Sequence, residues 1–171
     1  GGGYLGAITD STGRDGAEIF EKEIALGNIR SGGFDLNGMW APWYTLHKTF
    51  AGLRDACRYC GSRTALELET RFAQWTGRVL SDLTDEQIQM MLNTEFGGMN
   101  EVLVDLHVDT GDRRWLDLSR KFEHAAITDG LKQRRDTLPG KHGNTQVPKL
   151  IGSLDRYAAT GDAADLTAAS F

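Results

Sequence analysis

Three short stretches of the chain combine aromatic rings, amides, imidazoles and carboxylates in a way that packing alone does not require. They read NGMWAPWYTLHK at 37–48, NTEFGGMNE at 93–101 and GKHGNTQVPK at 140–149. Aromatic rings stack on the C–H faces of a sugar, polar side chains bind its hydroxyl groups, and a carboxylic acid can protonate a glycosidic oxygen. The mixture is typical of a carbohydrate site. The side chains that supply it are Trp40, Trp43, Tyr44, His47, Glu95, Asn100, Glu101, His142, Asn144 and Gln146.

Each of these side chains also has a structural explanation when it is taken alone. His47 could be a partly buried helix histidine, and Glu101 could be a first-turn acid that the helix dipole favours. Thr94 could be a helix N-cap. Asn144 could cap the next helix, with Pro148 in its first turn. The recurrence of three such stretches, rather than any one residue, therefore favours the carbohydrate site.

The two cysteines do not extend this chemistry. Cys57 and Cys60 have the C-x-x-C spacing of redox and zinc motifs. They lie late in a helical pattern, however, and no second cysteine or histidine pair follows at ligand spacing. We interpret them as two small residues on one face of a helix.

A repeat of fifty residues positions the three stretches. The turns YCGSRTAL, DTGDRRWL and ATGDAADL place Gly61, Gly111 and Gly161 at equal spacing, each followed by Ser or Asp and, five positions after the glycine, by leucine. Glycine in the left-handed conformation ends one helix, and Ser or Asp caps the next. Apolar residues at helical spacing flank each turn. The pattern predicts three helix–turn–helix units, with one of the three stretches before the first helix of each unit.

We therefore predict an all-α protein of helical hairpin repeats of about fifty residues, preceded by an irregular, glycine-rich segment at 1–45 with at most a short strand at its start. The hairpins are expected at about 46–80, 97–126 and 145–171. A capping-box pattern, TDEQ, predicts an extra short helix at roughly 85–92. Such hairpins build either an open solenoid or about half of an (α/α)6 barrel, and in both the three stretches gather at one end.

Composition narrows the classes of partner. The 171 residues carry a net charge of −5, and KQRR at 132–135 is the one short basic run. A nucleic-acid partner is not expected, and no apolar run approaches the ~18 residues of a membrane span. The chain begins with GGGYLGAI rather than methionine, and the last predicted helix is short. We expect a single partial domain from a longer polypeptide, and the cellular compartment stays open.

Four segments together resemble a known family. They are GNIRSGGFDLNGMWAPWYTLHKTFAGLRDA, LSDLTDEQIQMMLNTEFGGMNEVLVDL, TGDRRWLDLSRKF and LPGKHGNTQVPKLIG. In this order they are similar to glycoside hydrolase family 127 and its relative, family 146, the β-L-arabinofuranosidases. The resemblance implies the N-terminal half of an (α/α)6 catalytic barrel. It also implies a retaining hydrolase that removes terminal β-L-arabinofuranose.

The resemblance further implies a cysteine nucleophile held on zinc and a glutamate acid/base, a modified form of the two-carboxylate scheme. In the family these groups lie in the later half of the barrel, so they are expected beyond Phe171, and no catalytic or metal residue is expected in this chain. What carries over is substrate contact by His47, by the TEFGGMNE turn and by His142 in KHGNTQ. Phe96 stands where many relatives have histidine. The full set of predicted substrate contacts is Trp43, His47, Glu95, Phe96, Asn100, Glu101, His142, Asn144 and Gln146.

Two other functions fit the pattern. Another sugar enzyme on the same toroid, such as a lyase, an unsaturated-glucuronyl hydrolase or an epimerase, would use side chains already in the barrel instead of zinc. A non-enzymatic helical-repeat scaffold would bind protein partners along its concave face. The chain alone is expected to be inactive, because it would lack the nucleophile, the zinc and the acid. A half toroid also leaves apolar helix faces uncovered, so we predict that the chain self-associates or is marginally stable.

Overall fold

The structure is a computed structural model, and it describes residues 2–171. The chain divides into two compact units, Gly1–Phe96 and Gly97–Phe171. The first holds α1 (Gly16–Lys22), η1 (Ile24–Leu26), β1 (Ser31–Gly32), β2 (Asp35–Leu36), β3 (Met39–Trp40), α2 (Pro42–Cys60), α3 (Arg63–Leu80) and α4 (Asp85–Met91). The second holds α5 (Met99–Thr110), α6 (Arg113–Arg120), α7 (Ala125–Lys132), α8 (Gly143–Thr160) and α9 (Ala163–Ser170). The all-α prediction is confirmed.

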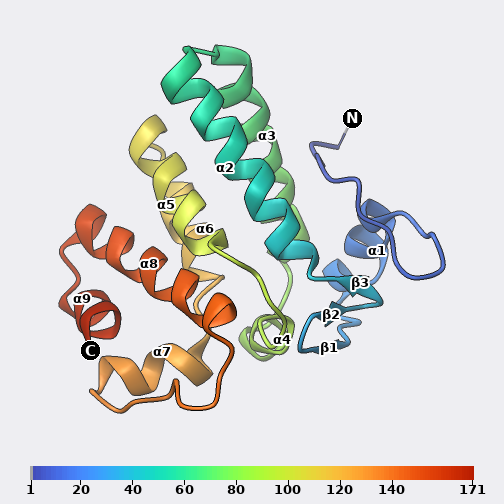
Figure 1. The fold of residues 1–171 in the computed structure, drawn as a ribbon. Helices are drawn as coiled ribbons and strands as arrows, with labels where there is room; N and C mark the ends of the chain where they lie inside the picture. Colours follow the sequence, from blue (N-terminus) through green and yellow to red (C-terminus); the bar gives the residue numbers. More distant parts are fainter. Residues whose placement is uncertain (1) are drawn as a thin grey trace. The chain divides into compact units, whose positions relative to one another are not determined.

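The fifty-residue repeat is present as three hairpins, α2–α3, α5–α6 and α8–α9 (Figure 1). Gly61, Gly111 and Gly161 all adopt the left-handed conformation that ends the first helix, with φ of 66°, 72° and 75°. The next residue caps the second helix each time, because the side chain of Ser62, Asp112 or Asp162 accepts a backbone N–H. The capping box of α4 is also present, between Thr84 and Gln87. One turn chemistry thus explains all three hairpins.

The predicted irregular segment at 1–45 is wrong in part. It contains α1, η1 and an antiparallel sheet of order β1–β2–β3, and α2 already begins at Pro42. Each strand has only two residues, too few to show an alternating pattern in the sequence. Asp15 caps α1 by accepting from the Ala17 amide. The eight-residue helix α7 was likewise not predicted, and Lys132 of the KQRR run is its last residue.

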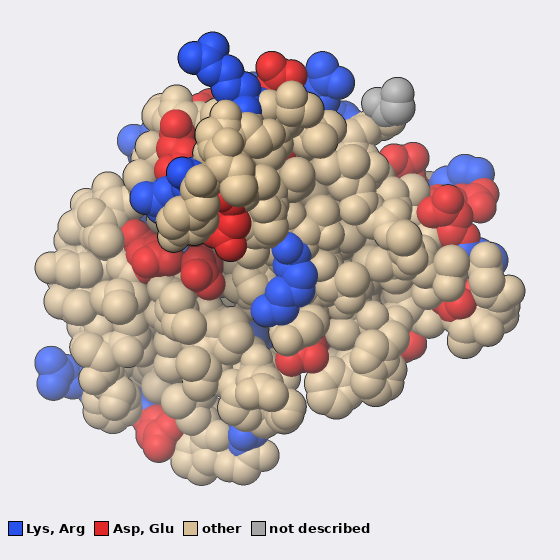
Figure 2. All heavy atoms as spheres, turned by 45° about the horizontal axis from the view of Figure 1, so that its top comes forward, with Lys and Arg blue, Asp and Glu red and all other residues tan. Residues whose placement is uncertain are grey.

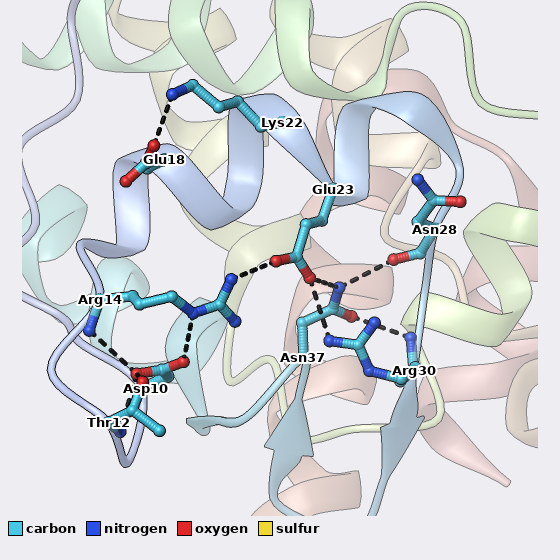
Figure 3. A network of polar contacts seen from close by, with 9 residues as sticks. All are labelled: Asp10, Thr12, Arg14, Glu18, Lys22, Glu23, Asn28, Arg30 and Asn37. Atoms are coloured by element: carbon cyan, nitrogen blue, oxygen red, sulfur yellow. Dashed lines mark hydrogen bonds and ion pairs between the residues drawn. The ribbon is translucent and has the colours of Figure 1, made fainter.

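A polar network connects the short helices and strands of this segment (Figure 3). Arg14 binds both Asp10 and Glu23, and the other Glu23 oxygen accepts from Arg30 and from Asn37. Hydrogen bonds from Arg14 and Asn37 lower the pKa of Glu23 to about 2. Asn37 has a positive φ of 52° and exchanges backbone hydrogen bonds with Arg30 through its own amide and its side chain. The network therefore fixes the turn between β2 and β3.

Aromatic rings fill the core of the first unit. Phe50 of α2 stacks on Phe72 of α3 at 4.3 Å, with an angle of 4° between the rings. Phe20 of α1 lies 4.7 Å from Trp43 and 5.3 Å from Trp75. Each fully buried aromatic side chain contributes about 1.5–3 kcal/mol of hydrophobic stabilisation. The α2–α3 hairpin is therefore anchored to α1 as well as to itself.

The second unit combines an apolar cluster with a buried ion pair. Ile127 and Leu131 of α7 pack with Ala168 of α9. Beside them, Arg156 of α8 forms a bidentate pair with Asp165 of α9, at 2.9 and 2.6 Å. Glu123 also binds Arg156, at 2.8 Å. Helix α8 packs against α5 as well as α9, so it is the element that joins the two hairpins of this unit.

Candidate functional site

The candidate site residues divide between the two units. Trp43, His47, Glu95 and Phe96 belong to the first unit, and Asn100, Glu101, His142, Asn144 and Gln146 belong to the second. Each group is described within its own unit.

His47 lies on the buried face of α2 and is 9% exposed. Its Nδ1 atom forms no hydrogen bond with any residue of 2–171. Burial, aided by the positive charge of Lys48, lowers the pKa of His47 to about 4. The ring is therefore neutral at pH 7 and can accept one hydrogen bond and donate another. A buried polar atom that packing leaves unsatisfied is suited to receive a hydroxyl group from a ligand.

The two tryptophans of the first stretch have opposite environments. Trp43 is 0% exposed, packs on Phe20, and donates Nε1–H to the Met91 sulfur at 3.2 Å. In this structure its ring has no free face for a sugar, which weighs against the predicted contact. Trp40 on β3 is 73% exposed and stacks on Phe34 at 5.1 Å. Sequence reasoning missed Phe34, because the strands that bring it to Trp40 are so short.

Gly33, which directly follows β1, holds the turn before α5 in place. Gly33 accepts hydrogen bonds from the Glu95 amide at 3.1 Å and from the Thr94 hydroxyl at 3.2 Å. Thr94, Glu95 and Phe96 are all buried. The interpretation of Thr94 as the N-cap of α5 is wrong, since the N-cap is Gly98. Thr94 instead fastens the backbone that carries Glu95, a tie between residues sixty-one apart that no local pattern predicts.

The two glycines that follow, Gly97 and Gly98, have different structural roles. Gly97 has φ of 58°, in the left-handed region, where a residue with a Cβ is strained. Gly98 is then the N-cap of α5, so no side chain caps this helix. The glycine pair therefore makes a sharp turn directly before the helix that carries Asn100 and Glu101.

Asn100 joins α5 to α8. Its Nδ2 donates to the Lys149 carbonyl at 2.9 Å, and its Oδ1 is buried without a hydrogen bond from residues 2–171. A Cβ on Gly152 would lie 2.3 Å from the Asn100 amide. Glycine at 152 is thus what allows α8 to approach this side chain. Glu101, the next residue, and Asp105 come together with Asp155 of α8, with carboxylate oxygens within 4.8 Å of one another.

The third stretch forms the start of α8. His142 is the N-cap residue and its side chain makes no capping bond. Asn144 lies inside the helix and is exposed, and Pro148 lies in the helix interior, so the interpretation of these two as cap and first-turn residues is wrong. Gln146 is partly buried, and its Oε1 accepts no hydrogen bond from the described residues. Along α8, His142 lies about 10 Å before Lys149. Lys149 is the residue whose carbonyl accepts from Asn100.

Two residues that sequence reasoning did not select face each other in the second unit. Lys149 of α8 is buried, and its Nζ lies 2.9 Å from Nδ1 of His124, also buried. Burial, together with the charges of Lys149 and Lys141, lowers the pKa of His124 to about 4. The imidazole is therefore neutral and accepts from the ammonium. The sequence gives little indication of this contact, because lysine side chains are normally exposed.

The described residues do not form the zinc site that the resemblance implies. Cys57 and Cys60 are free thiols in the last turn of α2, and within residues 2–171 they belong to no group of three side chains placed to bind a metal. Among the described residues the one such group is Glu101, Asp105 and Asp155, whose three carboxylates lack the thiolate and imidazole ligands typical of zinc. No zinc chemistry is assigned to these residues.

Charged side chains of both signs lie on the surface. On the face drawn in Figure 2, basic and acidic side chains are scattered among one another rather than gathered into a basic field. Among residues 2–171, no helix combines the length and apolar character that crossing a membrane requires.

The fold defines the class of protein as all-α with helical hairpin repeats, and the candidate residues include a buried imidazole together with amide and carboxylate side chains. Within that class, the sequence profile of the β-L-arabinofuranosidase GH127 catalytic domain matches residues 1–171. The chain therefore belongs to this glycoside hydrolase family. No curated protein matches the chain.

Proposed function

We propose that this chain supplies substrate contacts for the hydrolysis of terminal β-L-arabinofuranosides. The family match over all 171 residues carries the proposal. It favours hydrolysis over the lyase and epimerase alternatives and over a purely structural scaffold. The catalytic half of the reaction, with a zinc-held cysteine nucleophile and a glutamate acid/base, is expected outside residues 1–171.

His47 is the strongest single contact in this proposal. Its Nδ1 is buried and lacks a hydrogen bond from residues 2–171, and its ring is neutral at pH 7. A sugar hydroxyl that donates to this atom would satisfy it, and such a buried hydrogen bond contributes about 0.5–1.5 kcal/mol. A furanose ring is small and neutral, so it needs no charged partner. Glu95, Phe96, Asn100, Glu101, His142, Asn144 and Gln146 remain proposed contacts, and Trp43 is the weakest member because its ring is buried.

Nuclear magnetic resonance of the isolated chain tests this proposal. Titration with methyl β-L-arabinofuranoside should shift the ring signals of His47, and His47→Ala should abolish the response at the remaining sites. His107→Ala is the matched control, because the His107 ring bonds the Asp112 carbonyl at the far end of α5. Glucuronic acid should give no shift. An equal response to glucuronic acid, or none to the arabinofuranoside at millimolar concentration, would contradict the proposal.

An activity assay tests the expected division of labour. The chain should not hydrolyse p-nitrophenyl β-L-arabinofuranoside with or without added Zn²⁺, because no described residues form a thiolate site. Zinc-dependent turnover that chelators remove would show that the nucleophile lies within these 171 residues after all.

A further inference from the structure

One tryptophan of the chain is exposed, while the other three are buried. Trp40, the last residue of β3, is 73% exposed, whereas Trp43, Trp75 and Trp115 are at most 4% exposed. Phe34 stacks on the Trp40 ring at 5.1 Å, with an angle of 28° between the rings, so it covers one face of the indole. The high exposure of Trp40 means that the other face is open. We call this pair, Trp40 on Phe34, the aromatic platform.

The hairpin that carries the platform is held rigidly by other parts of the first unit. Its strands have only two residues each, and such a short hairpin is marginal by itself. Asn37, in the turn between β2 and β3, donates to the Glu23 carboxylate and accepts from the Arg30 amide (Figure 3). Met39 also pairs with Asp10. A ring that is fixed before a ligand arrives loses little freedom on binding, so this arrangement suits recognition.

A carboxylate lies beside the open ring. Asp35 pairs with Trp40 across β2 and β3, and residues directly opposite each other point to the same face of a sheet. Both are exposed, while the next pair, Leu36 and Met39, is buried on the other face. One Asp35 oxygen accepts from the Gly38 amide at 3.2 Å, which fixes the carboxylate. A sugar can stack its C–H face on the ring and donate a hydroxyl hydrogen to this carboxylate.

The platform adjoins the proposed sugar contacts of the first unit. Gly33, next to the platform in the chain, accepts from the Glu95 amide. Trp40 ends β3 just before α2 begins (Figure 1), and His47 lies about 7.5 Å along that helix from its first residue. Exposure rises from the buried His47 through Tyr44, whose ring is 6.5 Å from it, to Trp40. The platform is thus at the end of α2, whereas neighbouring hairpins in a helical repeat pack on the flanks of a helix.

We propose that the aromatic platform binds the sugar on the leaving-group side of the scissile bond. The substrate is then an L-arabinofuranosyl oligosaccharide or glycan chain rather than a glycoside of a non-sugar alcohol. This inference rests on the proposed function, in which His47 binds the terminal arabinofuranose. The buried imidazole suits the small terminal ring, and the exposed platform suits the sugar that continues into solvent. Trp40 therefore determines substrate specificity and takes no part in bond cleavage.

Nuclear magnetic resonance of the 171-residue chain tests this inference with two sugars. They are methyl β-L-arabinofuranoside and a disaccharide in which L-arabinofuranose is β-linked to a second arabinofuranose. The disaccharide should shift the indole N–H signal of Trp40, and the monosaccharide should not. Trp40→Ala should raise the dissociation constant of the disaccharide about tenfold and that of the monosaccharide less than about twofold. Trp40→Phe keeps a ring and should cost less than about threefold. Tyr59→Ala is the matched control, since Tyr59 is 81% exposed near the other end of α2.

The His47 and Trp40 signals distinguish failure of this inference from failure of the proposed function. A His47 response to both sugars, without a Trp40 response to the disaccharide, would overturn the platform and leave the proposed function standing. Equal losses for both sugars in a folded Trp40→Ala variant would also overturn it, because Trp40 would then contact the terminal ring. Silence of His47 with both sugars would contradict the proposed function, and the leaving-group assignment would fall with it.

Discussion

Lys149 and His124 face each other in the second unit, with the lysine nitrogen 2.9 Å from the imidazole Nδ1. The contact joins α8 to the N-cap of α7, because His124 is the residue that precedes that helix. A buried ammonium group is costly unless polar atoms surround it. The imidazole acceptor therefore helps to hold the part of α8 whose Lys149 carbonyl accepts from Asn100.

Removal of this acceptor should destabilise the second unit. His124→Ala deletes one hydrogen bond to a charged group and leaves a cavity, with an expected loss of about 2–3 kcal/mol in the free energy of unfolding. Urea denaturation at pH 7.5 measures it. His107→Ala, at the exposed end of α5, should lose under about 1 kcal/mol. Equal losses in both variants would show that the Lys149–His124 contact has no special weight.

Stability should fall with acid in a defined window. The pKa of His47 and of His124 is about 4 in the folded chain and about 6.5 when unfolded. The unfolded chain therefore binds protons first, and stability is lost as pH falls from 6.5 to 4. Because both rings keep partial contact with water, we expect about 1–2 kcal/mol from each rather than the full shift.

Urea melts at pH 7.5 and pH 4.5 test this window. The double variant His47→Gln/His124→Gln should be less stable at neutral pH but nearly insensitive to pH across it. An unchanged pH slope in that variant would assign the effect to other groups. Glu23 should contribute little above pH 4.5, since its stabilisation is lost only as pH falls from about 4.5, the value of a free glutamate, toward its folded pKa of about 2.

The sequence predicts the hairpins well because their turn chemistry is local. Gly61 and Ser62 lie within one turn of each other, so the left-handed residue and the cap can be read together. The short helices and strands within residues 1–45 could not be predicted in this way. Gly33 binds Thr94 across sixty-one residues, and Asn37 binds Glu23 across fourteen. Such ties depend on tertiary placement, which has no periodic signal.

The candidate site shows the same limit. The sequence identifies His47 as a polar residue within an apolar helix face, but it does not reveal that Trp43, four residues earlier, is fully buried. Both residues fall on the same side of α2 by helical spacing. Trp43 is covered by Phe20 of α1, whose ring packs against it. Helix α1 was absent from the predicted fold, so this cover could not be foreseen.

The α5–α8 contact should tolerate no side chain at position 152. Gly152→Ala would place a Cβ 2.3 Å from the Asn100 amide, and the buried Asn100 has little room to move. The expected loss is about 1–3 kcal/mol. In Gly152→Ala/Asn100→Ala the clash disappears, so the double variant should be more stable than the sum of the two single losses predicts. Strict additivity would show that the two residues do not contact each other.

The buried pair of Arg156 and Asp165 provides the sharpest test of how α9 is attached. Both side chains are almost wholly buried and bonded in bidentate fashion, with Glu123 as a second carboxylate on the arginine. Arg156→Met leaves Asp165 as a buried charge without this partner, and the expected loss is about 3–5 kcal/mol. Arg156→Met/Asp165→Leu removes both charges and should regain most of that loss, because burying an ion pair already carries a large desolvation cost.

Hydrogen exchange can show where Arg156→Met destabilises the chain. Amides of α9 should lose protection in Arg156→Met, while those of α2 and α3 in the first unit should not. A uniform loss of protection over the whole chain would instead mean that the pair supports global folding rather than the docking of α9 on α8.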